Sequence, residues 1–174
     1  MVRGRTAANK AAGLFRVWST KFNEPGGLWR RDYPLTDAAK KSRAAFNPLT
    51  DTVAPGCRPK GMPTIMEQPY PMEFVRKGDA ILLRLEEYDT VRTIDMAPRA
   101  KVDSLPNPSG VPQGPSSTIV ERFTSTSDGR LNYTMTVTDQ ATFTSPLELS
   151  RSWVWRPDEI VKPYNCVEAG SLRR

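Results

Sequence analysis

The sequence predicts an all-β domain with an antiparallel meandering sheet, either a lipocalin-like barrel or a strongly curved open sheet, and one short helix near the N-terminus. Two observations lead to this prediction. Apolar and polar residues alternate along about seven segments, and turn residues separate those segments at short intervals. Only one segment has the composition and the capping residues of a helix.

The clearest strand pattern lies in residues 130–138. Four apolar residues share one face of this segment and polar residues share the other, which is typical of a half-buried antiparallel strand. The tight turn Gly78-Asp79 separates two further apolar segments and predicts a hairpin. The remaining segments that we expect to form strands are residues 14–20, 71–77, 80–88, 90–96, 117–125 and 143–157.

The helix is expected over Thr36–Phe46. Thr36 is a favourable N-cap, alanine and lysine follow it, and the segment stops before Asn47-Pro48. Helices usually end at or before the residue that precedes a proline, because the proline ring disfavours helical backbone there. We therefore expect the helix to end before Asn47.

Two proline-rich segments interrupt the strand pattern. Residues 57–75, CRPKGMPTIMEQPYPMEFV, hold prolines at positions 59, 63, 69 and 71 and predict an extended strap laid over the domain, with no helix interior or central strand before Pro71. Residues 97–117 hold five prolines and two glycines, which predicts a loop or a linker.

The length of 174 residues suits one domain, which we place at residues 13–170 between a basic tail at 1–12 and a short tail at 171–174. The net charge of +6 comes mainly from the tails, so no basic stripe marks the body and we expect no nucleic-acid partner. No apolar run approaches the roughly 18 residues that a membrane span needs.

Histidine is absent from the chain. Its absence excludes Ser-His and Cys-His nucleophile schemes and removes the commonest metal ligand. Two cysteines cannot form a cysteine-rich zinc site. A hard cation held by Glu86, Glu87 and Asp89, and copper held by the methionines of the strap, are both disfavoured by the spacing of these residues. We therefore expect no metal and no cofactor.

The two cysteines, Cys57 and Cys166, permit two interpretations. They form a disulfide in an exported protein, or they are buried free thiols in a cytosolic one. We favour the disulfide, because it ties the start of the strap to the end of the chain and so explains the strap as a fixed cover. The loop that it closes is long and is worth roughly 4 to 5 kcal/mol in the chain-entropy model.

Several strings together resemble a group of uncharacterised exported bacterial β-rich proteins. They are CRPKGMPTIMEQPYPMEFV, LRLEEYDTVRTI, IVERFT, LNYTMTVTDQATFT and SWVWRP, and the similarity covers about residues 14–166. The Cys-x-Pro-x-Gly-Met-Pro and Glu-x-Asp-x-Val-Arg motifs carry it. The resemblance implies a periplasmic or secreted domain and no established reaction.

The chain departs from this group after the Val-Arg strand, where relatives carry a further hairpin. Here the proline-rich segment 97–117 takes its place, so a closed barrel is not assured. Missing strands leave an exposed sheet edge, which proteins cover, charge or pair. A homodimer formed across such an edge is therefore a hypothesis.

Polar residues on apolar strand faces are the candidate site. Glu121 shares a face with Ile119 and Phe123, and Arg151 and Tyr133 lie on apolar faces of their own strands. If these faces enclose one cavity, Glu121, Tyr133 and Arg151 converge in it. The alternative is a structural ion pair between Glu121 and Arg151.

Three functions fit these residues. The first is the binding of a small hydrophobic or aromatic ligand, with Arg151 or Tyr133 fixing a polar end. The second is a cofactor-independent lyase or isomerase in which Glu121 is the base and Tyr133 the acid. The third is an accessory subunit of a larger assembly. The residues predicted to line the ligand cavity are Phe123, Met135, Trp153, Trp155 and Glu87.

Overall fold

The structure is a computed structural model that describes residues 13–21, 32–48, 50–51, 57, 59–94, 110–112 and 114–167. It confirms the all-β prediction in its open form, a strongly curved antiparallel sheet with the order β4-β3-β2-β1-β7-β6-β5. The strands are β1 (Val17–Ser19), β2 (Met72–Lys77), β3 (Ala80–Leu85), β4 (Thr90–Ile94), β5 (Thr118–Ser125), β6 (Arg130–Thr138) and β7 (Leu147–Trp155).

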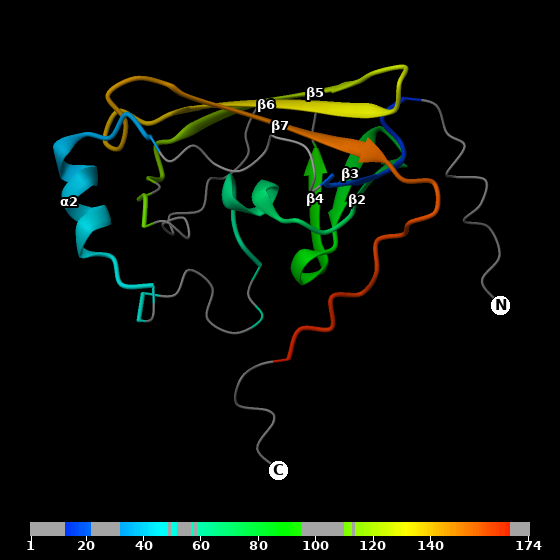
Figure 1. Ribbon diagram of the computed structural model, residues 1–174, viewed down its shortest axis with the longest axis horizontal. Coiled ribbons are helices and arrows are strands. Elements are labelled where there is room, and N and C mark those ends of the chain that lie inside the picture. The colour runs from blue at the N-terminus through cyan, green and yellow to red at the C-terminus, as the bar shows by residue number, and fades with distance from the viewer. Residues whose placement is uncertain are drawn as a thin grey trace, which may run out of the picture.

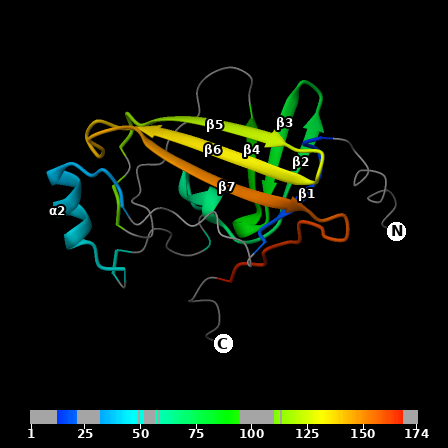
Figure 2. The ribbon, with the colours of Figure 1, turned by 45° about the horizontal axis from the view of Figure 1, so that its top comes forward.

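The sheet consists of two three-stranded meanders that the short strand β1 joins. Trp18 of β1 lies opposite Met72 of β2 on one side and Trp155 of β7 on the other. Figure 1 shows β5, β6 and β7 along one side of the molecule and β2, β3 and β4 below them. In Figure 2 the two meanders cross at a steep angle. The sheet therefore curls, and its concave face encloses the core.

The alternation in the sequence decides which side chains face this core. Leu131, Tyr133 and Met135 are buried along β6, while the residues between them are exposed or half-buried. The turn Gly78-Asp79 closes the β2–β3 hairpin as predicted, and Gly78 has φ +58°, which only glycine adopts without steric cost. The largest fully buried side chains include Trp18, Phe74, Met66, Leu83, Leu85 and Trp153.

Helix α2 (Asp37–Ala45) confirms the predicted helix. The hydroxyl of Thr36 accepts a hydrogen bond from Ala39 N and donates one to Ala141 O. The backbone N–H of Thr36 also donates to Thr142 O. These bonds attach the start of α2 to the connection between β6 and β7, and α2 lies at one end of the molecule (Figure 1).

The strap differs from its prediction in one respect. It contains a 3₁₀ helix, η1 (Thr64–Glu67), whereas we expected a wholly extended segment before Pro71. Pro63 occupies the N-cap position of η1, where the missing N–H costs nothing, so the prolines permit one helical turn between them. β2 then starts at Met72, as the sequence predicted.

The strand expected over residues 80–88 ends earlier, at Leu85. A 3₁₀ turn, η2 (Glu87–Asp89), follows, and both Tyr88 and Asp89 have positive φ. The prediction of a strand that includes Glu87 was therefore wrong. Glu87 is buried in the turn, where its carboxylate accepts a hydrogen bond from Lys60 Nζ at 2.7 Å.

Most of the proline-rich segment 97–117, and both predicted tails, lie outside the described residues. The described part, 110–112 and 114–117, is held by Asp139. Its carboxylate accepts hydrogen bonds from Gly114 N, Ser117 Oγ, Ala141 N and Thr142 Oγ1. Burial alone would raise the pKa of Asp139, but these bonds hold it below its ordinary value. This junction leads the chain into β5.

Within the described ranges, no helix is both long enough and apolar enough to cross a bilayer. The two edges of the sheet are β4 and β5.

Candidate functional site

The predicted residues Glu121 and Tyr133 do meet on the concave face. The Tyr133 hydroxyl donates to Glu121 Oε1 at 2.8 Å. Arg92, on the opposite edge strand β4, places Nη1 3.2 Å from Oε1 and Nη2 2.5 Å from Oε2 of the same carboxylate. The structural ion pair proposed between Glu121 and Arg151 was therefore wrong, because Arg92 is the cation that pairs with Glu121.

This group joins the two edges of the open sheet through side chains. Burial is the main cause that raises the pKa of Tyr133 far above its ordinary value, and the charge of Glu121 adds to it. The phenol thus stays protonated as a donor to Glu121, and both oxygens of that carboxylate already accept hydrogen bonds. In this arrangement the described partners of the Glu121 carboxylate are Arg92 and Tyr133, which come from the opposite edge strand and from the neighbouring strand.

Arg151 forms hydrogen bonds that are separate from those around Glu121. Its Nη1 donates to Met66 O at 2.7 Å and its Nη2 to Thr20 Oγ1 at 2.8 Å, while the guanidinium lies over the ring of Trp153. Arg151 therefore holds η1 of the strap against β7 and against the end of β1. It does not contact Glu121 through any hydrogen bond between described residues.

The predicted walls of the cavity pack mainly on one another. The ring centroids of Phe123 and Tyr133 lie 4.8 Å apart, those of Phe74 and Phe123 5.2 Å apart, and those of Tyr133 and Trp153 5.6 Å apart. Met135 Sδ accepts a hydrogen bond from the Tyr133 hydroxyl. These contacts are those of a packed core.

Trp155 is the last residue of β7 and packs, half-buried, against the core. The guanidinium of Arg16 covers its ring at 4.3 Å from the centroid. The five wall residues predicted from the sequence are therefore divided. Met135 and Trp153 lie in the core, Phe123 and Trp155 are half-buried and pack against it, and Glu87 lies in η2.

Glu67, at the end of η1, was not predicted. Burial raises the pKa of its carboxyl to about 8, although the positive charges of Lys60 and Arg151 lower it. The charge of Glu87 raises it further. Glu67 is thus a half-buried acid whose charge the structure disfavours near neutral pH.

The raised pKa predicts a pH dependence of stability that Glu67→Gln removes. Because the folded state binds the proton more tightly than the unfolded chain, Glu67 contributes stability below its ordinary pKa of 4.5, and this contribution is lost as pH rises towards about 8. We expect Glu67→Gln to raise the midpoint of thermal unfolding more at pH 8 than at pH 5. Circular dichroism at both pH values measures this, and an equal shift at both would contradict the assignment.

An open pocket of about 490 Å³ lies outside the core, at the end of β1. One wall comes from the segment between η1 and β2, a second from the end of β3, and a third from the chain that follows β7. Thr20 belongs to this pocket and also accepts the hydrogen bond from Arg151. The lining residues are Ser19, Thr20, Pro69, Tyr70, Pro71, Glu86, Arg156, Asp158, Glu159, Ile160 and Lys162.

Tyr70 lines this pocket and is exposed (37%), and its backbone is held by several contacts. The buried amide of Gln68 donates to Tyr70 O at 2.7 Å and accepts from Tyr70 N at 3.0 Å. Prolines flank Tyr70 on both sides, and Tyr164 stands edge-on to its ring, with centroids 5.5 Å apart and an interplanar angle of 79°. A hydrogen bond with Tyr70 is the main cause that raises the pKa of Tyr164 to about 12.

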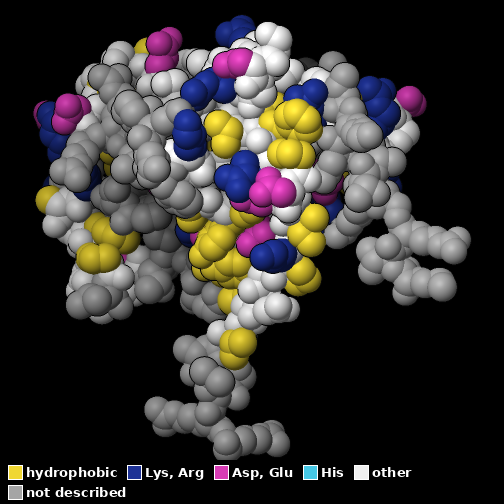
Figure 3. All heavy atoms as spheres, turned by 45° about the vertical axis from the view of Figure 1, so that its right-hand side comes forward, with side chains coloured by type: hydrophobic (Ala, Val, Ile, Leu, Met, Phe, Trp, Pro, Cys, Tyr) yellow, Lys and Arg dark blue, Asp and Glu magenta, His cyan; other side chains and the backbone are white. Residues whose placement is uncertain are grey.

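The charged side chains of the pocket largely engage one another. Arg156 forms ion pairs with Asp158 and Glu159, both at 3.3 Å, and Glu159 also accepts a hydrogen bond from Ser19 Oγ. By contrast, the Lys162 ammonium forms no hydrogen bond or ion pair with any described residue. In Figure 3, hydrophobic, acidic and basic side chains lie side by side on the face that is turned forward.

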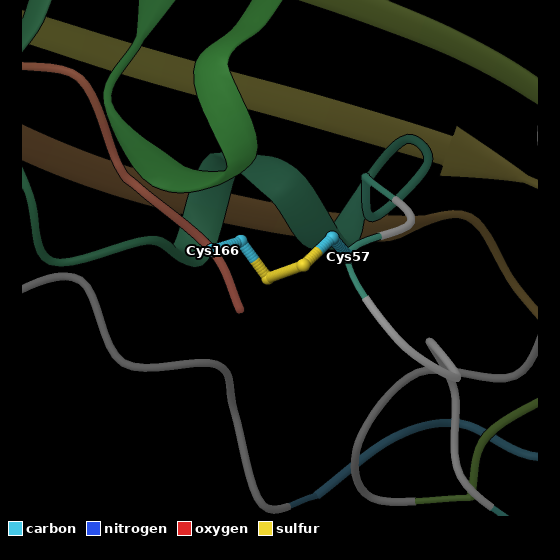
Figure 4. The surroundings of a disulfide bond; sticks show 2 residues. All are labelled: Cys57 and Cys166. Carbon is cyan, nitrogen blue, oxygen red and sulfur yellow. A yellow bond between two sulfur atoms is a disulfide. The ribbon is translucent and has the colours of Figure 1, made fainter. Parts of the chain in front are cut away.

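The C-terminal segment that forms the third wall is attached at a few points. Lys162 N donates to Glu86 Oε2 at 2.9 Å, and Tyr164 N donates to Asp89 Oδ1 at 3.1 Å. The disulfide between Cys57 and Cys166 then joins the end of this segment to the start of the strap. Figure 4 shows this bond beside the helical turn of the strap.

Sequence reasoning missed this pocket, although a signal was present. The string Gln-Pro-Tyr-Pro at 68–71 places an aromatic ring between two rigid residues, and the charged string 156–159 follows the last strand directly. Their meeting depends on how the strap and the C-terminal segment fold. Among the described residues, no group of three acidic or cysteine side chains is arranged to hold a metal ion.

No family model matches this sequence, and comparison with curated proteins and with solved structures finds no match. The resemblance to exported bacterial β-rich proteins stays a prediction, and the functional argument depends on the geometry of the pocket.

Proposed function

We propose that this protein is an exported small-molecule-binding protein whose ligand occupies the pocket beside Tyr70. One observation carries the proposal: the backbone of an exposed tyrosine is fixed by a buried amide and two prolines, and its ring packs edge-on against a second tyrosine ring at the pocket. Preorganised aromatic groups bind well because little side-chain entropy is lost when the ligand arrives.

The proposed site lies at the surface. The sequence analysis had instead predicted a cavity inside the curved sheet for a hydrophobic ligand. Core side chains contact each other across the concave face, and Glu121 is occupied by Arg92 and Tyr133. The surface pocket has a volume within the range of small-molecule sites and combines apolar with polar lining residues. The ligand that it fits is amphipathic, with a flat apolar face for Tyr70 and polar groups for the charged wall.

Tyr70→Ala is expected to weaken ligand binding by roughly five- to tenfold, because the stacking surface is lost. Tyr70→Phe keeps the ring and should bind almost as well as the natural protein. Ligand-observed NMR with a library of small ring-containing fragments measures both. If Tyr70→Ala binds the same fragments with unchanged affinity, the pocket is not the site.

Export is the part of the proposal that the disulfide supports, because such bonds persist in oxidising compartments.

Pairing of a second copy along the edge strands β4 and β5 is a separate proposal. Light scattering at high protein concentration tests it, and a strictly monomeric mass would exclude it.

A further inference from the structure

We infer that the ligand of this pocket is a neutral saccharide, bound through one pyranose ring that stacks on Tyr70. This inference depends on the proposed function, since it names the chemical class that the same site takes. Three properties of the pocket lead to it: the mixture of hydrogen-bond donors and acceptors, the exposed ring, and the near balance of charge.

Donors and acceptors occur together in the pocket wall. Arg156 and Lys162 can only donate, whereas Glu86, Asp158 and Glu159 accept when ionised. The hydroxyls of Ser19 and Thr20 can do both, and they lie in the same wall. A ligand that satisfies such a wall needs several adjacent groups that both donate and accept. Hydroxyl groups have this property, and a sugar ring carries them around its whole edge.

The second property is the apolar platform. Tyr70 presents a ring between Pro69 and Pro71, and the exposed side chain of Ile160 lies in the same pocket. A pyranose ring has a face of C–H groups that packs against an aromatic ring, while its hydroxyls point outward to the rim. Apolar stacking and hydrogen bonding at the edge are thus satisfied by one ligand.

The charge balance argues against other ligands. Two basic and three acidic side chains line the pocket, a difference of one charge, and Arg156 pairs with both Asp158 and Glu159. A purely apolar molecule would remove water from these charges without replacing its hydrogen bonds, which is costly. A strongly charged molecule would find no concentrated opposite charge. A neutral polyhydroxylated ligand avoids both costs.

Lys162 is the residue best suited to test the inference. Its backbone N–H holds the segment through Glu86 Oε2, so its side chain can change without breaking that contact. Its ammonium forms no hydrogen bond or ion pair with another described residue and offers three donors to sugar hydroxyls. Lys77, an exposed lysine about 20 Å along β2 from Pro71, is a matched control for the same substitution.

The experiment titrates the ¹⁵N-labelled protein with methyl β-D-glucopyranoside, methyl β-D-galactopyranoside and methyl 2-acetamido-2-deoxy-β-D-glucopyranoside, together with their β-linked disaccharides. Phenol, benzoate and benzylamine are the comparison probes. The backbone amide shifts of Gln68, Tyr70, Arg156 and residues 158–162 report on the pocket, since the prolines between them carry no N–H. We expect at least one saccharide to shift them in a saturable manner. Lys162→Met should weaken that binding roughly three- to tenfold, with the unfolding midpoint unchanged, while Lys77→Met leaves it unaltered.

Each outcome separates this inference from the proposed function. Saturable shifts with phenol, benzoate or benzylamine alone would overturn the saccharide inference and leave a small-molecule site at Tyr70. Saccharide binding that is insensitive to both Lys162→Met and Tyr70→Ala would also overturn it, because the ligand would then bind elsewhere. No pocket shift with any probe would overturn the saccharide inference and count against the proposed function as well.

Discussion

Replacing both cysteines, Cys57→Ser with Cys166→Ser, is expected to lower the free energy of unfolding by roughly 4 to 5 kcal/mol, because the bond closes a loop with a sequence separation of 109 residues. The conformational entropy that the unfolded chain regains when a disulfide is removed grows with the length of the loop, and this loop is long. Binding at Tyr70 should weaken as well, since the disulfide fixes the C-terminal segment that forms one wall of the pocket. Urea denaturation, followed by tryptophan fluorescence, measures the stability.

A reductant supplies the control. The natural protein should shift to the lower midpoint when it is reduced, whereas the double serine variant should show the same midpoint with and without reductant. Equal midpoints for the oxidised and the reduced natural protein would show that the bond does not stabilise the fold. The Tyr70 fragment binding assay, repeated under both conditions, then tests the effect on the pocket.

Arg92→Met is expected to cost about 2 to 4 kcal/mol, because it leaves the carboxylate of Glu121 without its cation in the interior. The side chains of Arg92 and Glu121 are each only 17% exposed, and they join the two edges of the sheet. Denaturant unfolding gives the loss. Hydrogen exchange in β4 and β5 should increase in the same variant, since no backbone ladder pairs these two edge strands.

The chain offers a matched control in Arg84, which pairs with Glu73 across β2 and β3 and is more exposed. Arg84→Met should cost less than about 1 kcal/mol, as exposed ion pairs do. The double variant Arg92→Met/Glu121→Gln should recover part of the loss, because no unpaired charge then remains. Equal costs for Arg92→Met and Arg84→Met would mean that the interior pair does not stabilise the curl.

The polar cluster around Glu121 on the concave face and the pocket beside Tyr70 differ in their chemistry. The concave face holds charged side chains that neutralise each other, and their neutralisation keeps the open sheet curled. The pocket at the end of β1 holds the exposed ring of Tyr70 and the ammonium of Lys162, which pairs with no residue of the described ranges, and these are the groups that we propose for ligand binding.

Local patterns were enough for most of the architecture. The alternation along residues 130–138 predicted the buried face of β6, and Thr36 predicted the start of α2, because both depend on neighbours a few positions away. The turn at Gly78-Asp79 likewise depends on one residue that tolerates positive φ. The curved antiparallel sheet follows from several such strands joined by short turns.

Partners that lie far apart in the chain could not be inferred in this way. The sequence places Glu121 and Arg151 on apolar faces, but it does not say that the curl of the sheet brings Arg92 from the opposite edge to Glu121. Nor does it say that Tyr70 and the segment 156–162 meet. Periodicity specifies the direction in which a side chain points from its strand, and only the path of the whole chain specifies which other side chain it finds there.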